Sequence, residues 1–245
     1  MMRVLALDTT TRAGSVAIVE NDTIVDERSG DAARAHAERL PGDLVAIVEA
    51  NHIGFRDVDL YAVASGPGSF TGLRIGIATM QGLAFVQQRQ TVGVGALQAL
   101  AHLGARDLSP GAIVAAWMDA HRRDVFAALY RVTDAPVFDP ARLEELDPPG
   151  VGDPASTLER WAEWRSGSPA LFIGDGAVLY TETIVHAMSG ARILPPPPIA
   201  GAVGRLAIAR AQRGGAVNPA GLQPLYVRRP DAEVAREQET QRTQR

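Results

Sequence analysis

The same layout occurs twice in the chain, and this repeat constrains the fold more than any other sequence feature. In each half an apolar run ends at an aspartate, a short polar turn follows, and a second apolar run begins. The two copies are LALDTTTRAGSVAIV, which contains Asp8, and AWMDAHRRDVFAALY, which contains Asp119. Apolar runs separated by polar turns are typical of strands, so the sequence predicts two duplicated lobes offset by about 110 residues. A chance likeness between two hairpins is the alternative.

The order of elements in the first half is typical of an α/β fold. Strands are expected at 4–7, 14–19, 23–28, 60–64 and 91–94, and helices at 32–52, 73–87 and 96–103. Pro41 predicts a kink or a restart within the first helix. In the second half we expect strands at 112–118, 125–132, 170–173 and 225–227, helices at 156–164, 178–188 and 202–213, and an irregular proline-rich stretch at 136–154.

These elements divide the chain into three parts. We expect an N-terminal lobe at 1–107 and a C-terminal lobe at 108–230. Residues 231–245 are polar, mixed in charge and nearly free of apolar side chains. Such a composition cannot bury enough apolar surface to order the backbone, so we expect a disordered tail there.

Two amino acids, lysine and cysteine, are missing from the sequence. Without lysine the chain has no phosphate-loop lysine and no Schiff-base lysine, and without cysteine it has no thiol nucleophile and no thiolate metal site. The formal charge of −4 argues against a protein that grips nucleic acid alone through a broad basic face. The longest apolar stretch, 73–86, is shorter than the roughly 20 residues of a membrane span. We expect a cytoplasmic protein with no membrane partner.

A glycine-rich segment, SGPGSFTG, follows a predicted strand and opens a predicted helix. Such a turn can direct free backbone N–H groups at a phosphate or another anion. The residues of this possible anion or nucleotide loop are Asp8, Thr9, Gly66, Gly68, Ser69 and Thr71. The alternative is a tight turn in which Ser69 or Thr71 caps the helix.

The two repeated aspartates also have two interpretations. In phosphotransferases with this layout, carboxylates such as Asp8 and Asp119 hold a metal or orient water, whereas a purely structural aspartate caps its own turn. For Asp119 we favour the cap, because the following turn contains no glycine. No two histidines have the three- or four-residue spacing that places two metal ligands on one helix face, so we expect no metal site on this chain.

Four segments together resemble the TsaB family. They are LALDTTTRAGSVAIV, HAERLPG, SGPGSFTGLRIGIATMQGLAF and the near-terminal PLYVR, in an order that spans about 3–228. The resemblance implies an α/β fold of two duplicated lobes of the acetate-and-sugar-kinase/Hsp70/actin type. It also implies a non-catalytic scaffold subunit of the bacterial complex that forms threonylcarbamoyladenosine next to the anticodon of tRNAs reading codons that start with A.

The resemblance places the metal and the nucleotide on other proteins. TsaD-like proteins have two metal histidines four residues apart, and here Ala96 and Leu100 stand at those positions. Neither side chain can bind a metal. No cofactor is therefore expected on this chain, whereas ATP and metal are expected on TsaD and on the ATPase TsaE.

The resemblance also implies the partners. TsaD would pair with this chain through the first two long helices, and a second copy of the chain would take its place when TsaD is absent. TsaE would be recruited to this pair. The tRNA would bind only within the complex. The interface residues expected on these helices are His36, Leu40, Leu73, Ile77, Met80 and Gln81. The rival interpretations are a small-molecule kinase of the same fold, suggested by Asp8 and Asp119, and a metallopeptidase-like protein.

Overall fold

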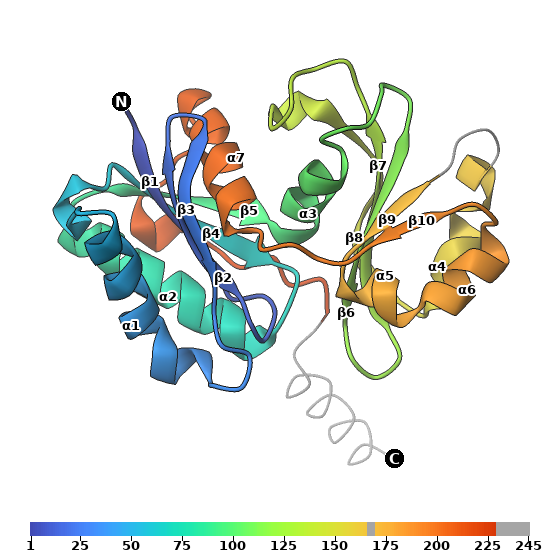
Figure 1. Cartoon of the computed structure of the whole chain (residues 1–245), viewed down its shortest axis with the longest axis horizontal. Helices are drawn as coiled ribbons and strands as arrows, with labels where there is room; N and C mark the ends of the chain where they lie inside the picture. The colour runs from blue at the N-terminus through green and yellow to red at the C-terminus, as the bar shows by residue number, and fades with distance from the viewer. Residues whose placement is uncertain (166–169, 229–245) are drawn as a thin grey trace, which may run out of the picture.

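The computed structural model describes residues 1–165 and 170–228, so the tail expected at 231–245 lies outside the described residues. Two five-stranded mixed sheets form the two lobes (Figure 1). The N-terminal sheet has the order β3 (Thr23–Ser29), β2 (Ser15–Glu20), β1 (Arg3–Asp8), β4 (Leu60–Gly66) and β5 (Gln90–Gly95). The C-terminal sheet has the order β8 (Leu143–Gly152), β7 (Val125–Val132), β6 (Ile113–Asp119), β9 (Leu171–Ile173) and β10 (Arg192–Leu194).

The two sheets confirm the repeat. In each lobe the first strand pairs antiparallel with the second and parallel with the fourth. Asp8 pairs with Ser15 at the end of β1, and Asp119 pairs with Val125 at the end of β6. Both aspartates therefore occupy the same place in equivalent hairpins, as the sequence predicted.

Helices cover both outer faces and fill the space between the sheets. The helices α1 (His36–Ala50) and α2 (Phe70–Val86) pack on the outer face of the N-terminal sheet, while α4 (Pro154–Arg160), α5 (Asp175–Leu179) and α6 (Thr181–Ala187) belong to the C-terminal lobe. The helices α3 (Ala96–Gly104) and α7 (Ala200–Gln212) lie between the lobes, in the largest apolar core. Within the described residues, no helix combines the length and the apolar character that crossing a membrane requires.

The last helix packs on the first lobe, which corrects the predicted lobe boundaries. The backbone N–H of Ala200 donates to the hydroxyl of Ser15 at 3.1 Å, and that of Gly201 donates to Glu27 at 2.7 Å. Further along, Thr91 pairs with Val217 in an isolated bridge. The range 108–230 is therefore not one C-terminal lobe, because α7 and the segment up to Leu225 contact the N-terminal sheet.

Several local expectations were also wrong. The proline-rich stretch contains β8, an edge strand whose pairing with β7 shifts register near its prolines, where the missing N–H groups are tolerated. The helix expected at 156–164 is instead the shorter α4, which begins at Pro154 and is capped by Asp153, whose side chain accepts from the N–H of Ser156 at 3.0 Å. The helix α1 runs through Pro41 without a restart, and 225–227 is not a strand.

Candidate functional site

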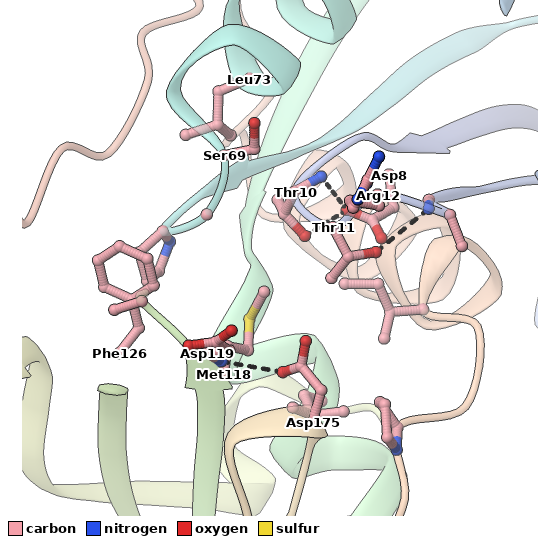
Figure 2. A pocket seen from close by; sticks show the side chains of 18 of the residues that line it. Asp8, Thr10, Thr11, Arg12, Ser69, Leu73, Met118, Asp119, Phe126 and Asp175 are labelled. Carbon is pink, nitrogen blue, oxygen red and sulfur yellow. Dashed lines mark hydrogen bonds between the residues drawn. The ribbon is translucent and has the colours of Figure 1, made fainter. Parts of the chain in front are cut away.

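A cavity of about 1070 Å³ lies between the two lobes (Figure 2). The segments that line it are the β1–β2 loop, the start of α2, the β6–β7 turn, the proline-rich link before α7, and residues 225–228. Its lining includes three aspartates, Asp8, Asp119 and Asp175, together with four arginines. The cavity thus collects the carboxylates of both repeats at the ends of equivalent strands.

Asp8 is the most buried of these carboxylates, with 4% of its surface exposed. Its Oδ1 accepts hydrogen bonds from the backbone N–H of Thr10 at 2.8 Å and from the Thr10 hydroxyl at 2.6 Å. Burial raises the pKa of Asp8 above its ordinary value, the Thr10 hydrogen bonds oppose this shift, and the nearby charge of Asp175 adds to it. A carboxyl group in such a place is pushed toward its protonated form.

The glycines that open α2 bring the helix into direct contact with the loop after β1. A Cβ atom on Gly68 would lie 2.5 Å from Cβ of Thr10, and one on Gly72 would lie 2.1 Å from the carbonyl oxygen of Thr9. Ser69 caps the helix, since its hydroxyl accepts from the N–H of Gly72 at 3.2 Å. The segment therefore has the turn-and-cap role that was one of its two interpretations.

Four of the six residues expected in an anion or nucleotide loop line the cavity. They are Asp8, Gly68, Ser69 and Thr71. Thr9 is instead completely buried, and its hydroxyl donates to the carbonyl oxygen of Gly72 at 2.7 Å. Gly66 faces the C-terminal segment, because a Cβ there would lie 2.7 Å from the carbonyl oxygen of Leu225. Binding of an anion in this loop stays a prediction.

Asp119 caps its own turn, and a third aspartate supports it. The Oδ1 of Asp119 accepts from the N–H of His121 at 2.8 Å, and its Oδ2 lies 3.1 Å from Nδ1 of the same histidine. Asp175, at the start of α5, accepts from the backbone N–H of Asp119 at 3.0 Å. Sequence analysis assigned no role to Asp175, although an aspartate between Gly174 and Gly176 directly after a predicted strand was the available signal.

Comparison with known proteins identifies the family. The family described as "TsaD: tRNA N6-adenosine threonylcarbamoyltransferase" matches residues 22–180. The tRNA threonylcarbamoyladenosine biosynthesis protein TsaB of Escherichia coli (strain K12) is 31% identical over 189 residues, which cover 73% of this chain and 81% of that protein. The chain belongs to the TsaB family.

Other TsaB relatives agree with this assignment. The Bacillus subtilis (strain 168) protein of the same name is 26% identical over 185 residues, covering 75% of each chain. The solved structure of YeaZ from Pseudomonas aeruginosa has a TM-score of 0.74 at 27% identity and covers 92% of this chain and 100% of that one. The duplicated lobes of this TsaB family member are therefore of the acetate-and-sugar-kinase/Hsp70/actin type, as the resemblance implied.

The two positions that the resemblance equates with TsaD metal ligands lie in a packed core. Ala96 is completely buried on α3 and Leu100 is 2% exposed, and both belong to the apolar cluster between the sheets. No group of three or more histidine, cysteine or acidic side chains in the described parts of the chain could hold a metal ion. The residues at this place do not fit a metal, because aliphatic side chains have no lone pairs to offer.

Four of the six interface residues expected on α1 and α2 are buried inside the lobe, which corrects that part of the list, while an interface role of the partly exposed His36 and Gln81 stays a prediction. Leu40, Ile77 and Met80 are at most 6% exposed and pack in the core beneath the two helices. Leu73 is 1% exposed and lies at the interlobe cavity. The remaining two are held within the chain, because the ring of His36 lies 2.8 Å from the carbonyl oxygen of Thr11, and Gln81 donates to the carbonyl oxygen of Pro219 at 2.8 Å. These side chains stabilise the lobe itself.

The outward faces of α1 and α2 carry small and apolar residues. We call them the outer helical face, and its members are Gly42, Val45, Ala46, Ala78, Gly82 and Phe85. Phe85 is 75% exposed, and a Cβ added to Gly42 or Gly82 would meet no atom within 4 Å. Small residues four apart permit close approach of another helix. The two helices lie side by side on the same face of the sheet (Figure 1).

Proposed function

We propose that this chain takes part in the formation of threonylcarbamoyladenosine in tRNA as a non-catalytic subunit that pairs with TsaD. The observation that carries the proposal is a TsaB-family fold in which Ala96 and Leu100, the two positions that the resemblance equates with TsaD metal ligands, are aliphatic and buried. A subunit with no lysine and no cysteine, and with aliphatic side chains at these two positions, has few groups for catalysing acyl transfer, so we assign it the role of binding and positioning the subunit that does.

The outer helical face is the proposed site of pairing. Its exposed phenylalanine provides apolar surface, and its small residues allow a partner helix to approach closely. Burial of several hundred square ångströms of surface on each partner is enough for a specific complex. TsaD would occupy this face in the assembled complex, and a second copy of the chain would occupy it otherwise. TsaE would join this pair, and tRNA would bind only to the assembly, in the cytoplasm.

A reconstitution tests the proposed role. The purified chain is mixed with TsaD, TsaE, ATP, tRNA and a threonylcarbamoyl adenylate donor, and the modified nucleoside is measured by mass spectrometry. We expect modification to be lost when the chain is left out. Equal modification with and without the chain would contradict the proposal.

A matched pair of variants tests the surface. Ala78→Glu places a charge on the outer helical face, and Ala155→Glu places the same charge on an exposed alanine of α4 in the other lobe. We expect only Ala78→Glu to weaken co-elution with TsaD and to lower modification, since a charge buried in an apolar interface is costly. If both variants pair with TsaD equally well, the outer helical face is not the pairing site.

The nucleotides are proposed to bind TsaD and TsaE, and not this chain. The reason is that the opening of α2 is filled by its own contacts with Thr9 and Thr10, and the sequence has no lysine to bind a phosphate. Isothermal titration of the isolated chain with ATP and magnesium tests this. Micromolar binding would instead support the kinase interpretation based on Asp8 and Asp119.

A further inference from the structure

The last described residues of the chain begin in the N-terminal lobe. Leu222 is 4% exposed and packs in the core beneath α1 and α2, and its carbonyl oxygen accepts from Gln81 at 3.1 Å. Three residues later the backbone N–H of Leu225 donates to the carbonyl oxygen of Ser65, at the end of β4, at 2.7 Å. The segment is therefore attached to the N-terminal sheet at one end.

Its middle is attached to the start of α2 by an aromatic and cationic cluster. The rings of Tyr226 and Phe70 lie 5.3 Å apart, and the guanidinium of Arg74 lies 4.0 Å from the centre of the Phe70 ring. The Nε of Arg74 also donates to the Tyr226 hydroxyl at 3.2 Å. These contacts hold the segment at the edge of the cavity, which Leu225 and Tyr226 help to line.

Its end is attached to the other lobe. Arg228 donates to the carbonyl oxygen of Ala120 at 2.6 Å and forms an ion pair with Asp124, so one guanidinium bridges both ends of the β6–β7 turn. The same guanidinium lies 5.8 Å from the centre of the Phe126 ring. A charge-assisted pair combined with a carbonyl contact fixes the side chain in direction as well as in distance.

The β6–β7 turn, which Arg228 contacts, has an unusual backbone. His121, Arg122 and Arg123 have φ angles of 59°, 54° and 68°, a conformation that non-glycine residues adopt at a cost. The N–H of Ala120 donates to the carbonyl oxygen of Asp124 at 3.1 Å and closes the turn. The turn therefore offers Arg228 a carbonyl and a carboxylate in a fixed arrangement.

We propose that residues 222–228 form an interlobe strap, with Arg228 as its anchor, that sets the separation of the two lobes and so the width of the cavity. The lobes are already joined on one side by α3 and α7, which pack in a common core. A second connection at the cavity edge removes the remaining freedom to hinge about that core (Figure 1). The lobes then keep one relative position when the cavity holds no ligand.

The strap also touches the helix that carries part of the outer helical face. Phe70 and Arg74 lie on the first two turns of α2, and Ala78 follows one turn later. A change in lobe separation would therefore reach α2 through Tyr226. The inference concerns the isolated chain and does not depend on the proposed role in tRNA modification.

The test measures the distance between the lobes in the full chain. The sequence contains no cysteine, so the substitutions Glu49→Cys on α1 and Glu182→Cys on α6 introduce two unique exposed positions for spin labels. Electron–electron resonance then gives the distribution of label distances. For the chain with an intact strap we expect one narrow distribution.

Three further variants are compared in this background. Arg228→Ala removes the anchor, Asp124→Ala removes its partner on the hairpin, and Arg131→Ala removes an exposed ion pair with Glu144 that lies wholly within the C-terminal lobe. We expect Arg228→Ala and Asp124→Ala to broaden the distribution and shift it, while Arg131→Ala leaves it unchanged. Circular dichroism confirms that each variant is folded.

Two outcomes would overturn the strap. The first is a distribution that stays as narrow in both folded strap variants as in the parent. The second is an equal broadening in the Arg131→Ala control, which would attribute the effect to the loss of any arginine pair. Pairing with TsaD is not part of the readout, so failure of the proposed function leaves this result interpretable.

Discussion

Asp8 and Asp175 line the same cavity from opposite lobes, and the negative charge of Asp175 contributes to the raised pKa of Asp8. The larger contribution comes from burial of Asp8 at the end of β1. The interlobe cavity thus contains a carboxyl group whose charged form is disfavoured by its surroundings. The Thr10 hydrogen bonds compensate only in part.

The first prediction concerns Asp8→Asn. Because folding raises the pKa of Asp8, its ionisation lowers the free energy of unfolding. This penalty is absent well below the ordinary value of 3.8, grows as the pH rises, and is complete above the pKa in the folded state. An asparagine keeps an oxygen for the two Thr10 hydrogen bonds and removes the charge. We expect the variant to be more stable than the parent at pH 7, with a smaller difference in acid, as measured by urea unfolding.

An exposed aspartate provides the control for this prediction. Asp107→Asn changes the same group on the surface between α3 and β6 and should leave the urea midpoint nearly unchanged at pH 7. A destabilised Asp8→Asn protein at neutral pH would show that the carboxylate is stabilised by its surroundings, in contrast to the structure.

The second prediction concerns His102, which is buried in the core between the lobes. Its ring is 1% exposed, stacks on Phe138 at 5.9 Å, and has no hydrogen-bond partner at either nitrogen. Burial lowers the pKa of His102 from 6.5 to about 4, and the charges of Arg210 and Arg142 add to this shift. The unfolded chain therefore binds a proton first, so stability falls as the pH drops from 6.5 to about 4.

The size of this effect follows from the shift. At 1.36 kcal/mol per pKa unit, the free energy of unfolding at pH 4 is about 3 kcal/mol lower than at neutral pH. We expect His102→Leu to flatten this part of the stability curve, measured by urea unfolding at several pH values. The exposed His186→Leu variant is the control and should keep the slope. If the free energy of unfolding still falls as steeply with pH in His102→Leu, groups other than His102 cause the pH dependence.

The sequence indicated some features of the fold well and others poorly, for physical reasons. The lobes and their equivalent hairpins follow from local patterns around Asp8 and Asp119, which a single sequence contains in full. The packing of α7 on the first sheet depends on contacts such as that between Gly201 and Glu27, which are 174 residues apart and leave no local pattern. Pro148 and Pro149 argued against a strand at β8, but an edge strand with shifted register tolerates prolines that a central strand would not.

The partner surface could not be assigned from the sequence for a different reason. The helix α2 is apolar almost all round, so periodicity does not separate the side that faces the sheet from the side that faces outward. Bulky residues such as Leu73 and Ile77 were assigned to the interface, whereas the structure buries them and exposes Ala78 and Gly82. Residue size does not separate the two sides either, because the helix also buries Gly76 and exposes Phe85.

The third prediction separates these two sides of α2. Ile77 is 6% exposed, and Ile77→Asp places a carboxylate in the core, where we expect a loss of about 3 kcal/mol or more of unfolding free energy. The neighbouring Ala78→Glu variant changes an exposed position and should remain folded. Thermal unfolding followed by circular dichroism measures both. Equal stability of the two variants would mean that Ile77 is accessible to solvent.

The fourth prediction uses two glycines of the same helix. A Cβ atom on Gly76 would lie 2.2 Å from Oγ1 of Thr9, whereas one on Gly82 would meet nothing within 4 Å. Gly76→Ala should therefore destabilise the protein by about 1–3 kcal/mol through overpacking. Gly82→Ala should stabilise it by about 0.5–1 kcal/mol, because alanine loses less backbone freedom in a helix. Urea unfolding of both variants measures the opposite signs, and a stabilising Gly76→Ala would show that α2 does not rest on the loop after β1.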